Sequence, residues 1–282
     1  MKQQLTVKKI KILLIGTYGV LFCIAYFPVM QRLINSWAMS EEYSHGFLIV
    51  PISLYLVWNK RETLLKVESY YSTVGQVIFF LSLVLYLFST VAEISTLASI
   101  SMVLTLSGSI IALYGFKMFR VIAFPVFFLF FMIPVPAQII ASMTIPLQLF
   151  VSKISVISAS LLGIPIFREG NIIYLPEKTL QVVQACSGLR SLVSLLTLSL
   201  IFGYFSFKSN IMRTVLFIAG VPVAIFVNII RVFLIISAFY YIELDLTKGS
   251  IHTIMGILIF ALALGCILVL GRILSRWDDS IM

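Results

Sequence analysis

The stretch QVVQACSGLRS, residues 181–191, marks the point at which a polar segment becomes a long apolar run. It would bring a thiol, two hydroxyls and a guanidinium together at the surface of a membrane. Cys186 and Arg190 are four residues apart, so a helix would carry both on one face. A thiol in the first turn of a helix meets the positive end of the helix dipole and ionises more easily. Most membrane cysteines are inert packing residues, so the rest of the chain must decide whether Cys186 is functional.

The composition predicts an all-α polytopic membrane protein. Of the 282 residues, 61% are hydrophobic and 11% are charged, whereas soluble domains average roughly 45–50% and about 25%. The net charge of +9 is expected to mark cytoplasmic loops, and no nucleic-acid partner is predicted. Cys23 and Cys266 lie inside apolar runs, and the three cysteines indicate no disulfide framework.

About eight transmembrane helices are predicted, since several runs approach the ~20 apolar residues that cross a bilayer. We expect them in a single integral membrane domain covering residues 1–282, surrounded by membrane lipids. The basic residues between the runs predict that both termini are cytoplasmic. The expected spans are 10–29, 46–58, 74–92, 94–114, 121–135, 187–205, 214–241 and 251–270.

Residues 137–185 are expected to form an extracytoplasmic insert. Polar residues dot the segment 137–162, which predicts one or two helices lying at the outer membrane interface, although entry into the bilayer is left open. A small β-hairpin is expected over residues 163–184. Its strands would contain Ile164 and Ile166 and then residues 172–175, and turns are predicted at 168–171 and 176–179.

Cys186, Arg231 and His252 are predicted to lie at one depth. Counted from Lys208, Arg213 and Arg272 at the cytoplasmic helix ends, they lie roughly 33, 27 and 30 Å away at 1.5 Å per residue. That depth is close to the ~30 Å thickness of the hydrocarbon layer. A charge inside an apolar helix usually faces the bundle interior and has a partner. The alternatives are an arginine that only anchors its helix and a histidine that only caps one.

The three residues together predict nucleophilic catalysis. Cys186 would attack a peptide carbonyl, His252 would act as acid and base, and Arg231 would stabilise the oxyanion or the thiolate. Arg190 is a weaker candidate for the same electrostatic role or for binding an acidic group of the substrate. Asn228 shares a helical face with Arg231 and could orient it.

His45 lies in the segment 43–46, which is also expected on the outer side, and a histidine next to an interface is often structural. A zinc site built from Cys186, His45 and His252 is conceivable. The usual CxxC and HExxH spacings are absent, so neither a metal nor another cofactor is predicted.

Together these motifs resemble the exosortase/archaeosortase family of membrane enzymes, over about residues 44–256. The CSGLR form of the cysteine segment is more similar to the bacterial exosortases. The resemblance rests on YSHG at 43–46, IPVP at 133–136, ACSGLRS at 185–191, NIIR at 228–231 and His252 at the start of the last helix.

The resemblance implies a Cys186–Arg231–His252 active site that faces away from the cytoplasm in the cytoplasmic (inner) membrane. It also implies substrates: secreted proteins whose C-terminal sorting signal combines a short motif, a hydrophobic helix and a basic tail. The motif is Pro-Glu-Pro in the bacterial branch, known as PEP-CTERM. The enzyme would cut near the motif and transfer the protein to an envelope acceptor, which the sequence does not identify.

Two other functions are compatible with the sequence. One is an intramembrane cysteine protease that releases its product by hydrolysis. The other is a non-catalytic scaffold or channel for export of envelope polysaccharide or protein. In that case Arg231 and Arg190 would bind an anionic ligand, and Cys186 would be incidental.

Overall fold

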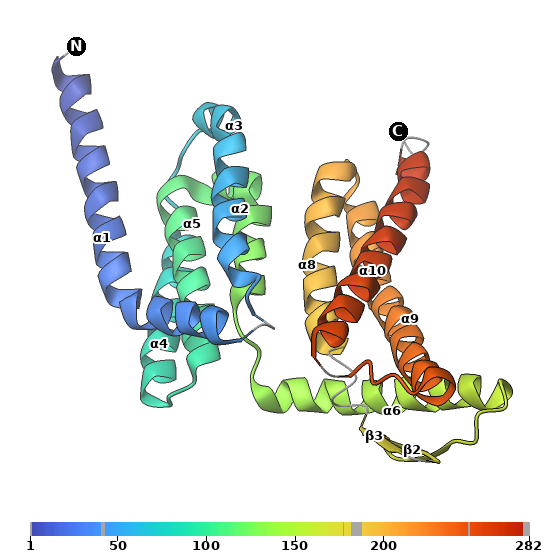
Figure 1. Cartoon of the computed structure of the whole chain (residues 1–282). Helices are drawn as coiled ribbons and strands as arrows, with labels where there is room; N and C mark the ends of the chain where they lie inside the picture. Colours follow the sequence, from blue (N-terminus) through green and yellow to red (C-terminus); the bar gives the residue numbers. More distant parts are fainter. Residues whose placement is uncertain (1, 41–42, 177, 182–187, 248, 279–282) are drawn as a thin grey trace. The chain divides into compact units, whose positions relative to one another are not determined.

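The computed structural model describes residues 2–40, 43–176, 178–181, 188–247 and 249–278, and the side chains of residues 2–12, 14 and 188–191 lie outside this description. The described chain is mostly helical, with one small sheet, as the composition predicts. It forms two compact units, Met1–Val135 and Pro136–Met282 (Figure 1). The single membrane domain stays a prediction.

Unit 1 contains five α-helices and a short 3₁₀ helix. The first helix extends ten residues past the expected end of its span, because Leu33 and Trp37 beyond that end are buried. Pro28 lies inside this helix, and Figure 1 shows the helix changing direction in its last third, as a proline kink allows. The elements are α1 Lys2–Met39, α2 Gly46–Asn59, α3 Arg61–Lys66, α4 Thr73–Val91, α5 Ser95–Phe128 and η1 Leu129–Met132.

The expected spans 94–114 and 121–135 form one helical segment that is broken at Gly115. Gly115 has φ 84° and ψ 170°, a conformation open to glycine because it lacks a Cβ. The part of α5 before Gly115 packs on α4, where Gly75 approaches the backbone of Ala112. The part after it packs on α2, where the Ser53 hydroxyl donates to the Pro125 carbonyl over 3.1 Å.

Six segments of the described chain are long and apolar enough to cross a membrane, so the prediction of eight spans is not confirmed. The segment Ser95–Met132 counts once, although it contains two of the expected spans. The helix Ala137–Leu161 is among the six, although it was expected at the interface. Two further apolar helices, Gly46–Asn59 and Leu192–Ser206, are shorter. A multi-pass helical membrane protein remains the class that this pattern defines.

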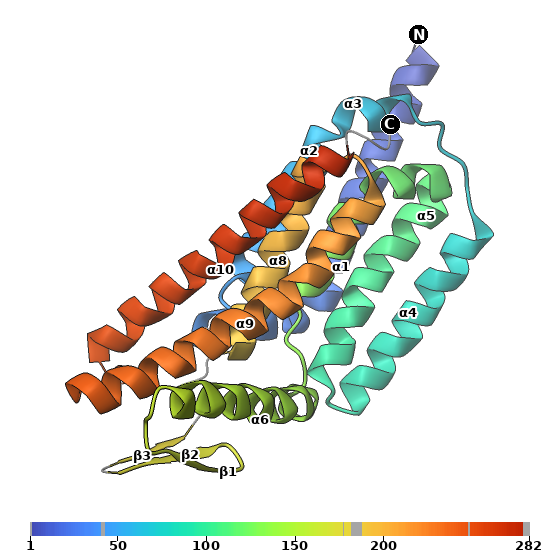
Figure 2. The same ribbon diagram turned by 90° about the vertical axis from the view of Figure 1, so that its right-hand side faces the viewer.

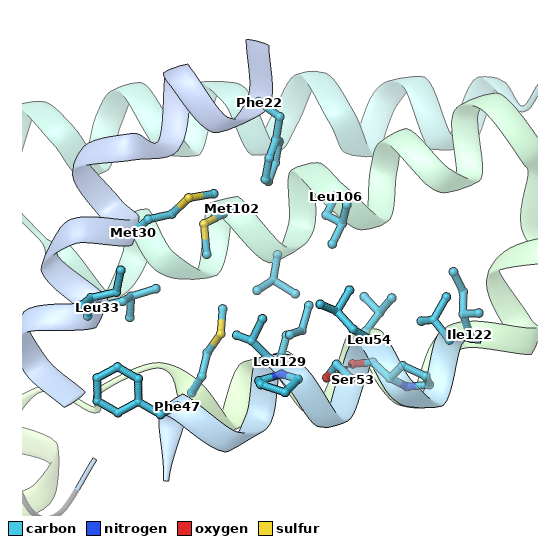
Figure 3. Close-up of a pocket in the computed structure, with 18 of the residues that line it drawn as sticks. Phe22, Met30, Leu33, Phe47, Ser53, Leu54, Met102, Leu106, Ile122 and Leu129 are labelled. Carbon is cyan, nitrogen blue, oxygen red and sulfur yellow. Dashed lines mark hydrogen bonds between the residues drawn. The ribbon is translucent and has the colours of Figure 1, made fainter. Parts of the chain in front are cut away.

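Unit 1 also holds a cavity of about 690 Å³ between α1, α2, α5 and η1 (Figure 3). Its walls are almost entirely aliphatic and aromatic. Two of the lining residues carry polar hydrogens, and both donate to backbone carbonyls: Ser53 to Pro125, and Trp37 to Met132 over 2.9 Å. Polar chemistry is therefore expected elsewhere in the chain.

Unit 2 is a helical bundle with a helix and a sheet at one end. Figure 1 and Figure 2 both show α6 lying across the end of α8, α9 and α10, with the strands beyond α6. The segment that was expected at the interface is thus one helix that lies across the end of the bundle. The elements are α6 Ala137–Leu161, β1 Phe167–Glu169, β2 Ile172–Leu175, β3 Lys178–Gln181, α8 Gly188–Ser206, α9 Asn210–Ile242 and α10 Gly249–Asp278.

The sheet has three antiparallel strands in the order β1-β2-β3, which corrects the predicted hairpin. Residues 178 and 179 were expected in a turn, but they begin β3, where Leu180 is buried between the exposed Thr179 and Gln181. Ile164 and Ile166 precede β1 and lie outside the strands. This alternation places one face of the sheet on the core.

Two apolar clusters share α9 and make it the central element of unit 2. Val232, Ile235 and Ile236 pack with α6 and with Ile173 and Leu180 of the sheet. Earlier on the same helix, Ala224 and Val227 pack with α8 and α10.

Four basic residues of unit 2, Lys208, Arg213, Arg272 and Arg276, lie at the bundle end opposite the sheet. There, Asp278 of α10 accepts hydrogen bonds from the backbone N–H groups of Lys208 and Ser209. Arg213 donates to the carbonyl of Phe207 in the same turn.

Replacing Gly108 with alanine should destabilise unit 1 by roughly 1–3 kcal/mol, because overpacking forces neighbouring atoms apart. A Cβ at Gly108 would lie 2.6 Å from the backbone nitrogen of Phe79, so α4 and α5 would have to separate. Gly16→Ala on α1 is the matched control, since a Cβ there meets nothing within 4 Å. Unfolding in detergent measures both variants. Equal stability of the two would contradict the close approach of α4 and α5.

Candidate active site

Arg231 of α9 and His252 of α10 are in direct contact. Arg231 is 2% exposed, and its Nη2 lies 2.9 Å from Nε2 of His252. A guanidinium has only donors, so Nε2 must be the acceptor, and a neutral His252 must carry its hydrogen on Nδ1. The contact therefore fixes the tautomer of the histidine.

The apolar faces of the two helices bring this polar pair together. On α9, the buried residues Ala224, Val227, Asn228, Arg231 and Ile235 follow a spacing of three and four residues, which forms one stripe along a helix. On α10, the buried positions 259, 263 and 267 form a matching stripe, and His252 lies seven residues before the first of them. Packing of these stripes leaves Arg231 and His252 opposite each other.

A small cavity between α8, α9 and α10 adjoins Arg231. It has a volume of about 10 Å³, and its lining includes Asn228, Arg231, Leu195 and Ile259. That volume corresponds to about one water molecule. Asn228 is 6% exposed and lies one helical turn before Arg231. The amide and the guanidinium thus border the same buried space.

Two of the predicted site residues lie wholly or partly outside the description. Cys186 falls in the segment 182–187, outside the described residues, and α8 begins two residues later at Gly188. Arg190 belongs to the first turn of α8, but its side chain is also outside the described part. The structure therefore brings together two of the three proposed catalytic residues, and their catalytic roles stay predictions.

His45 belongs to unit 1, just before α2. Its Nε2 lies 3.2 Å from the carbonyl oxygen of Phe131, and because a carbonyl can only accept, Nε2 of His45 is the donor. This contact ties the start of α2 to the 3₁₀ helix η1. The histidine thus has a structural contact within its own unit.

The described residues contain no group of three or more His, Cys, Asp or Glu side chains that could hold a metal ion. The expectation of a metal-free site rests on the residue types at 186, 231 and 252.

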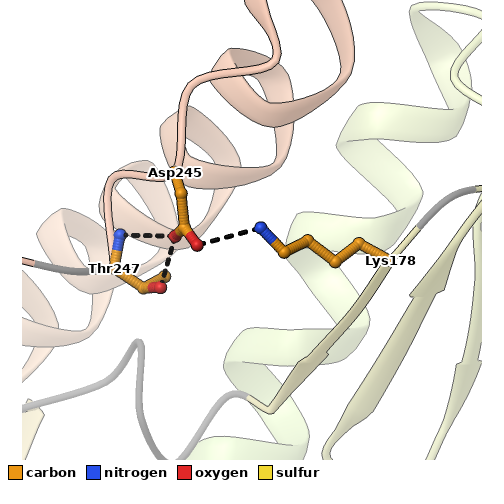
Figure 4. Close-up of polar contacts among 3 residues, drawn as sticks. All are labelled: Lys178, Asp245 and Thr247. Atoms are coloured by element: carbon orange, nitrogen blue, oxygen red, sulfur yellow. Dashed lines mark hydrogen bonds and ion pairs between the residues drawn. The ribbon is translucent and has the colours of Figure 1, made fainter.

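Lys178 and Asp245 form a contact that the sequence analysis did not identify (Figure 4). The Lys178 Nζ lies 2.9 Å from Oδ2 of Asp245 and 4.1 Å from the ring centroid of Phe239. The other carboxylate oxygen accepts from the backbone N–H and the hydroxyl of Thr247. The Asp-x-Thr spacing could have predicted the contact of Asp245 with Thr247, since an aspartate often accepts from the residue two positions later. No sequence feature pointed to Lys178 as the partner of Asp245.

Fold and site together define a multi-pass helical membrane protein in which a buried guanidinium contacts a half-buried imidazole near one end of a bundle. Comparison with protein families identifies it further. The chain belongs to the transmembrane exosortase family (Exosortase_EpsH), whose family model matches residues 37–269. This confirms the resemblance noted in the sequence. Neither a curated protein nor a solved structure matches the chain.

Family membership supports a membrane transpeptidase-type role in general, because exosortases are cysteine peptidases or transpeptidases that process sorting-signal substrates. The matched residues include the described pair Arg231 and His252, and they also include Cys186 and His45.

The two histidines of the chain should carry their hydrogens on opposite nitrogens. At about pH 8, above the pKa of ~6.5 of an unperturbed histidine, the single ring hydrogen should lie on Nδ1 in His252 and on Nε2 in His45. Nitrogen-15 NMR of the histidine-labelled protein measures this directly, and His45→Gln assigns the signals. Arg231→Met should release the Nδ1 preference of His252 and leave His45 unchanged. A hydrogen on Nε2 of His252 in the unaltered protein would contradict the contact.

Proposed function

We propose that this chain is a membrane-embedded cysteine transpeptidase. It cleaves the C-terminal sorting signal of secreted proteins at the outer face of the cytoplasmic membrane and transfers the protein to an envelope acceptor. The observation that carries the proposal is the contact between Arg231 and His252 inside the exosortase family match. Burying a guanidinium in a membrane helix costs free energy, and ionisable residues in such helices usually belong to functional sites.

The contact suggests how the first proton moves. With Arg231 donating to Nε2, His252 has no free lone pair with which to take the thiol proton of Cys186. Nε2 becomes the base when the guanidinium turns away toward the negative charge that forms on sulfur or on the carbonyl oxygen. A guanidinium beside a neutral imidazole opposes its protonation, and a developing anion draws the guanidinium off. Arg231 thereby couples protonation of His252 to formation of the anion.

The two half-reactions then balance. Cys186 sulfur bonds to the peptide carbonyl carbon while its proton passes to Nε2 of His252. The oxyanion collapses, the C–N bond breaks, and the same proton moves to the leaving amine, which gives a thioester. An acceptor amine or hydroxyl attacks the thioester, its proton passes by way of His252 to the departing sulfur, and the C–S bond breaks.

The supporting residues have narrower roles in this proposal. Asn228 lies one turn from Arg231 and orients the guanidinium across the small cavity that they share. Arg190, four residues after Cys186, binds an acidic group of the substrate or adds positive charge near the thiolate. His45 is kept as a supporting residue on the sequence motif alone, and its contact with Phe131 lies within unit 1.

The proposed orientation follows from charge. Lys208 and Arg213 lie at one end of the unit 2 bundle and Arg231 lies eighteen residues after Arg213, roughly 27 Å along the helix. If the basic end faces the cytoplasm, the pair with His252 lies near the outer boundary of the bilayer. A sorting signal that crosses the membrane as a helix would present its outer end at that level.

Cys186→Ala should abolish processing of a sorting-signal substrate, and His252→Gln should lower it about 10²- to 10⁴-fold, the range of general acid–base catalysis. Arg231→Lys should be less active than the unaltered enzyme although it keeps the positive charge, because an ammonium lacks the planar fork of a guanidinium. The rates are measured in membranes with a tagged substrate.

The product and the covalent intermediate separate the alternatives. Mass spectrometry should find the substrate attached to Cys186 after rapid quenching, and a transferred group on the new C-terminus. A free carboxylate on the product would indicate hydrolysis. Full processing by Cys186→Ala would remove the covalent mechanism.

A further inference from the structure

Three segments of unit 2 meet at the contact between Lys178 and Asp245. Lys178 is the first residue of β3, Asp245 lies in the loop between α9 and α10, and Phe239 lies near the end of α9. The ammonium of Lys178 contacts both the Asp245 carboxylate and the face of the Phe239 ring. One side chain thus joins a strand, a helix end and a loop.

Each of these segments leads to one residue of the proposed catalytic set. Cys186 follows Lys178 by eight residues in the sequence. Arg231 is two helical turns before Phe239 on α9. His252 follows Asp245 by seven residues and lies in the first turn of α10. The contact therefore joins the strand that precedes Cys186 in the sequence, the helix that carries Arg231 and the loop that precedes His252.

Apolar packing alone does not fix the position of the sheet along α9. Ile173 and Leu180 of the sheet pack on Ile235 and Ile236, but apolar attraction is non-directional. An ion pair with a defined donor and acceptor restricts sliding, and both oxygens of Asp245 are engaged. The hydroxyl of Thr247, and then Lys178, hold the pKa of Asp245 well below its usual range, so this carboxylate is charged at neutral pH.

Resting on the proposed function, we infer that Lys178 and Asp245 are positioning residues of the exosortase site. Their ion pair holds β3 in register with the start of α10, and so aligns the segment that carries Cys186 with His252. Lys178 is 39% exposed on its side chain, and ion pairs of that exposure contribute little to global stability. Breaking the pair should therefore shift the segments without unfolding the protein.

Lys178→Met and Asp245→Asn should each lower kcat by about ten- to a hundred-fold, the loss that a displacement of about 1 Å can cause. KM should change by less than about threefold, since the substrate is still bound. The double variant should be no slower than the single ones, because both remove the same contact. Lys178→Arg keeps the charge and should restore most of the rate.

Two exposed charges of unit 2 provide the matched controls. Lys153→Met on α6 removes a positive charge, as Lys178→Met does, and Glu169→Gln on β1 removes a negative charge, as Asp245→Asn does. Both positions lie away from β3 and the α9–α10 loop. Both should process the substrate at the unaltered rate. A loss in these controls equal to that of Lys178→Met would overturn a specific role for the pair.

A distance measurement tests the inference without relying on activity. In the full chain with Cys23, Cys186 and Cys266 replaced by serine, spin labels at Thr179→Cys and Ile251→Cys report the distance between β3 and α10. Both positions are exposed. The distance distribution should be narrow, should broaden or shift in Lys178→Met and Asp245→Asn, and should stay narrow in Lys153→Met.

The two readouts distinguish the possible failures. If the distribution is unchanged while kcat falls, Lys178 acts on the substrate and the positioning role is wrong. If the distribution broadens while kcat is unchanged, the pair is structural only and the inference is also overturned. If the unaltered protein forms no adduct at Cys186, the proposed function fails, and the spin-label distances still decide whether the pair holds the two segments.

Discussion

Burial of the Arg231 guanidinium inside α9 is the constraint on which the arrangement of unit 2 depends. On insertion scales a charge costs about 2.5–3.5 kcal/mol at the centre of a membrane helix and less toward its ends, where Arg231 is proposed to lie. That cost is offset only if the charge faces other helices and donates hydrogen bonds. The contact with His252 meets this condition, and it requires α9 and α10 to pack with one particular pair of faces together. The polar pair thus selects the register, and the apolar stripes around it provide the attraction.

The same division of roles appears at the end of the bundle that carries the sheet. The apolar cluster of α6, the sheet and α9 holds these elements against one another. Lys178, Asp245 and Thr247 then add directional contacts at the edge of that cluster (Figure 4). Unit 1 relies instead on close backbone approach, with Gly75 and Gly108 on facing helices. Its cavity is lined by apolar side chains (Figure 3). Within the described residues, the polar pairs that bear on the proposed chemistry lie in unit 2.

The tautomer of His252 links the resting geometry to the proposed reaction. A histidine that accepts from Arg231 cannot at the same time accept from a thiol through that nitrogen. The resting contact therefore keeps the base occupied until negative charge forms nearby. Such an arrangement would limit premature ionisation of a reactive thiol at a membrane surface. It also gives Arg231 two successive partners, for which a guanidinium with five donors is better suited than a lysine.

The sequence by itself determined the class of the protein, most helix positions and the family. Long apolar runs have few solutions in a bilayer, because the backbone must satisfy its own hydrogen bonds there. The sequence also singled out Arg231 and His252, since an ionisable residue in an apolar run has few structural explanations. Tertiary structure decided the length of α1, the break at Gly115, the third strand and the crosswise course of α6. It showed the contact between Arg231 and His252, which the sequence had predicted only as members of one site, and it alone paired Lys178 with Asp245. These features depend on contacts between residues distant in sequence, and local periodicity carries no information about which faces meet.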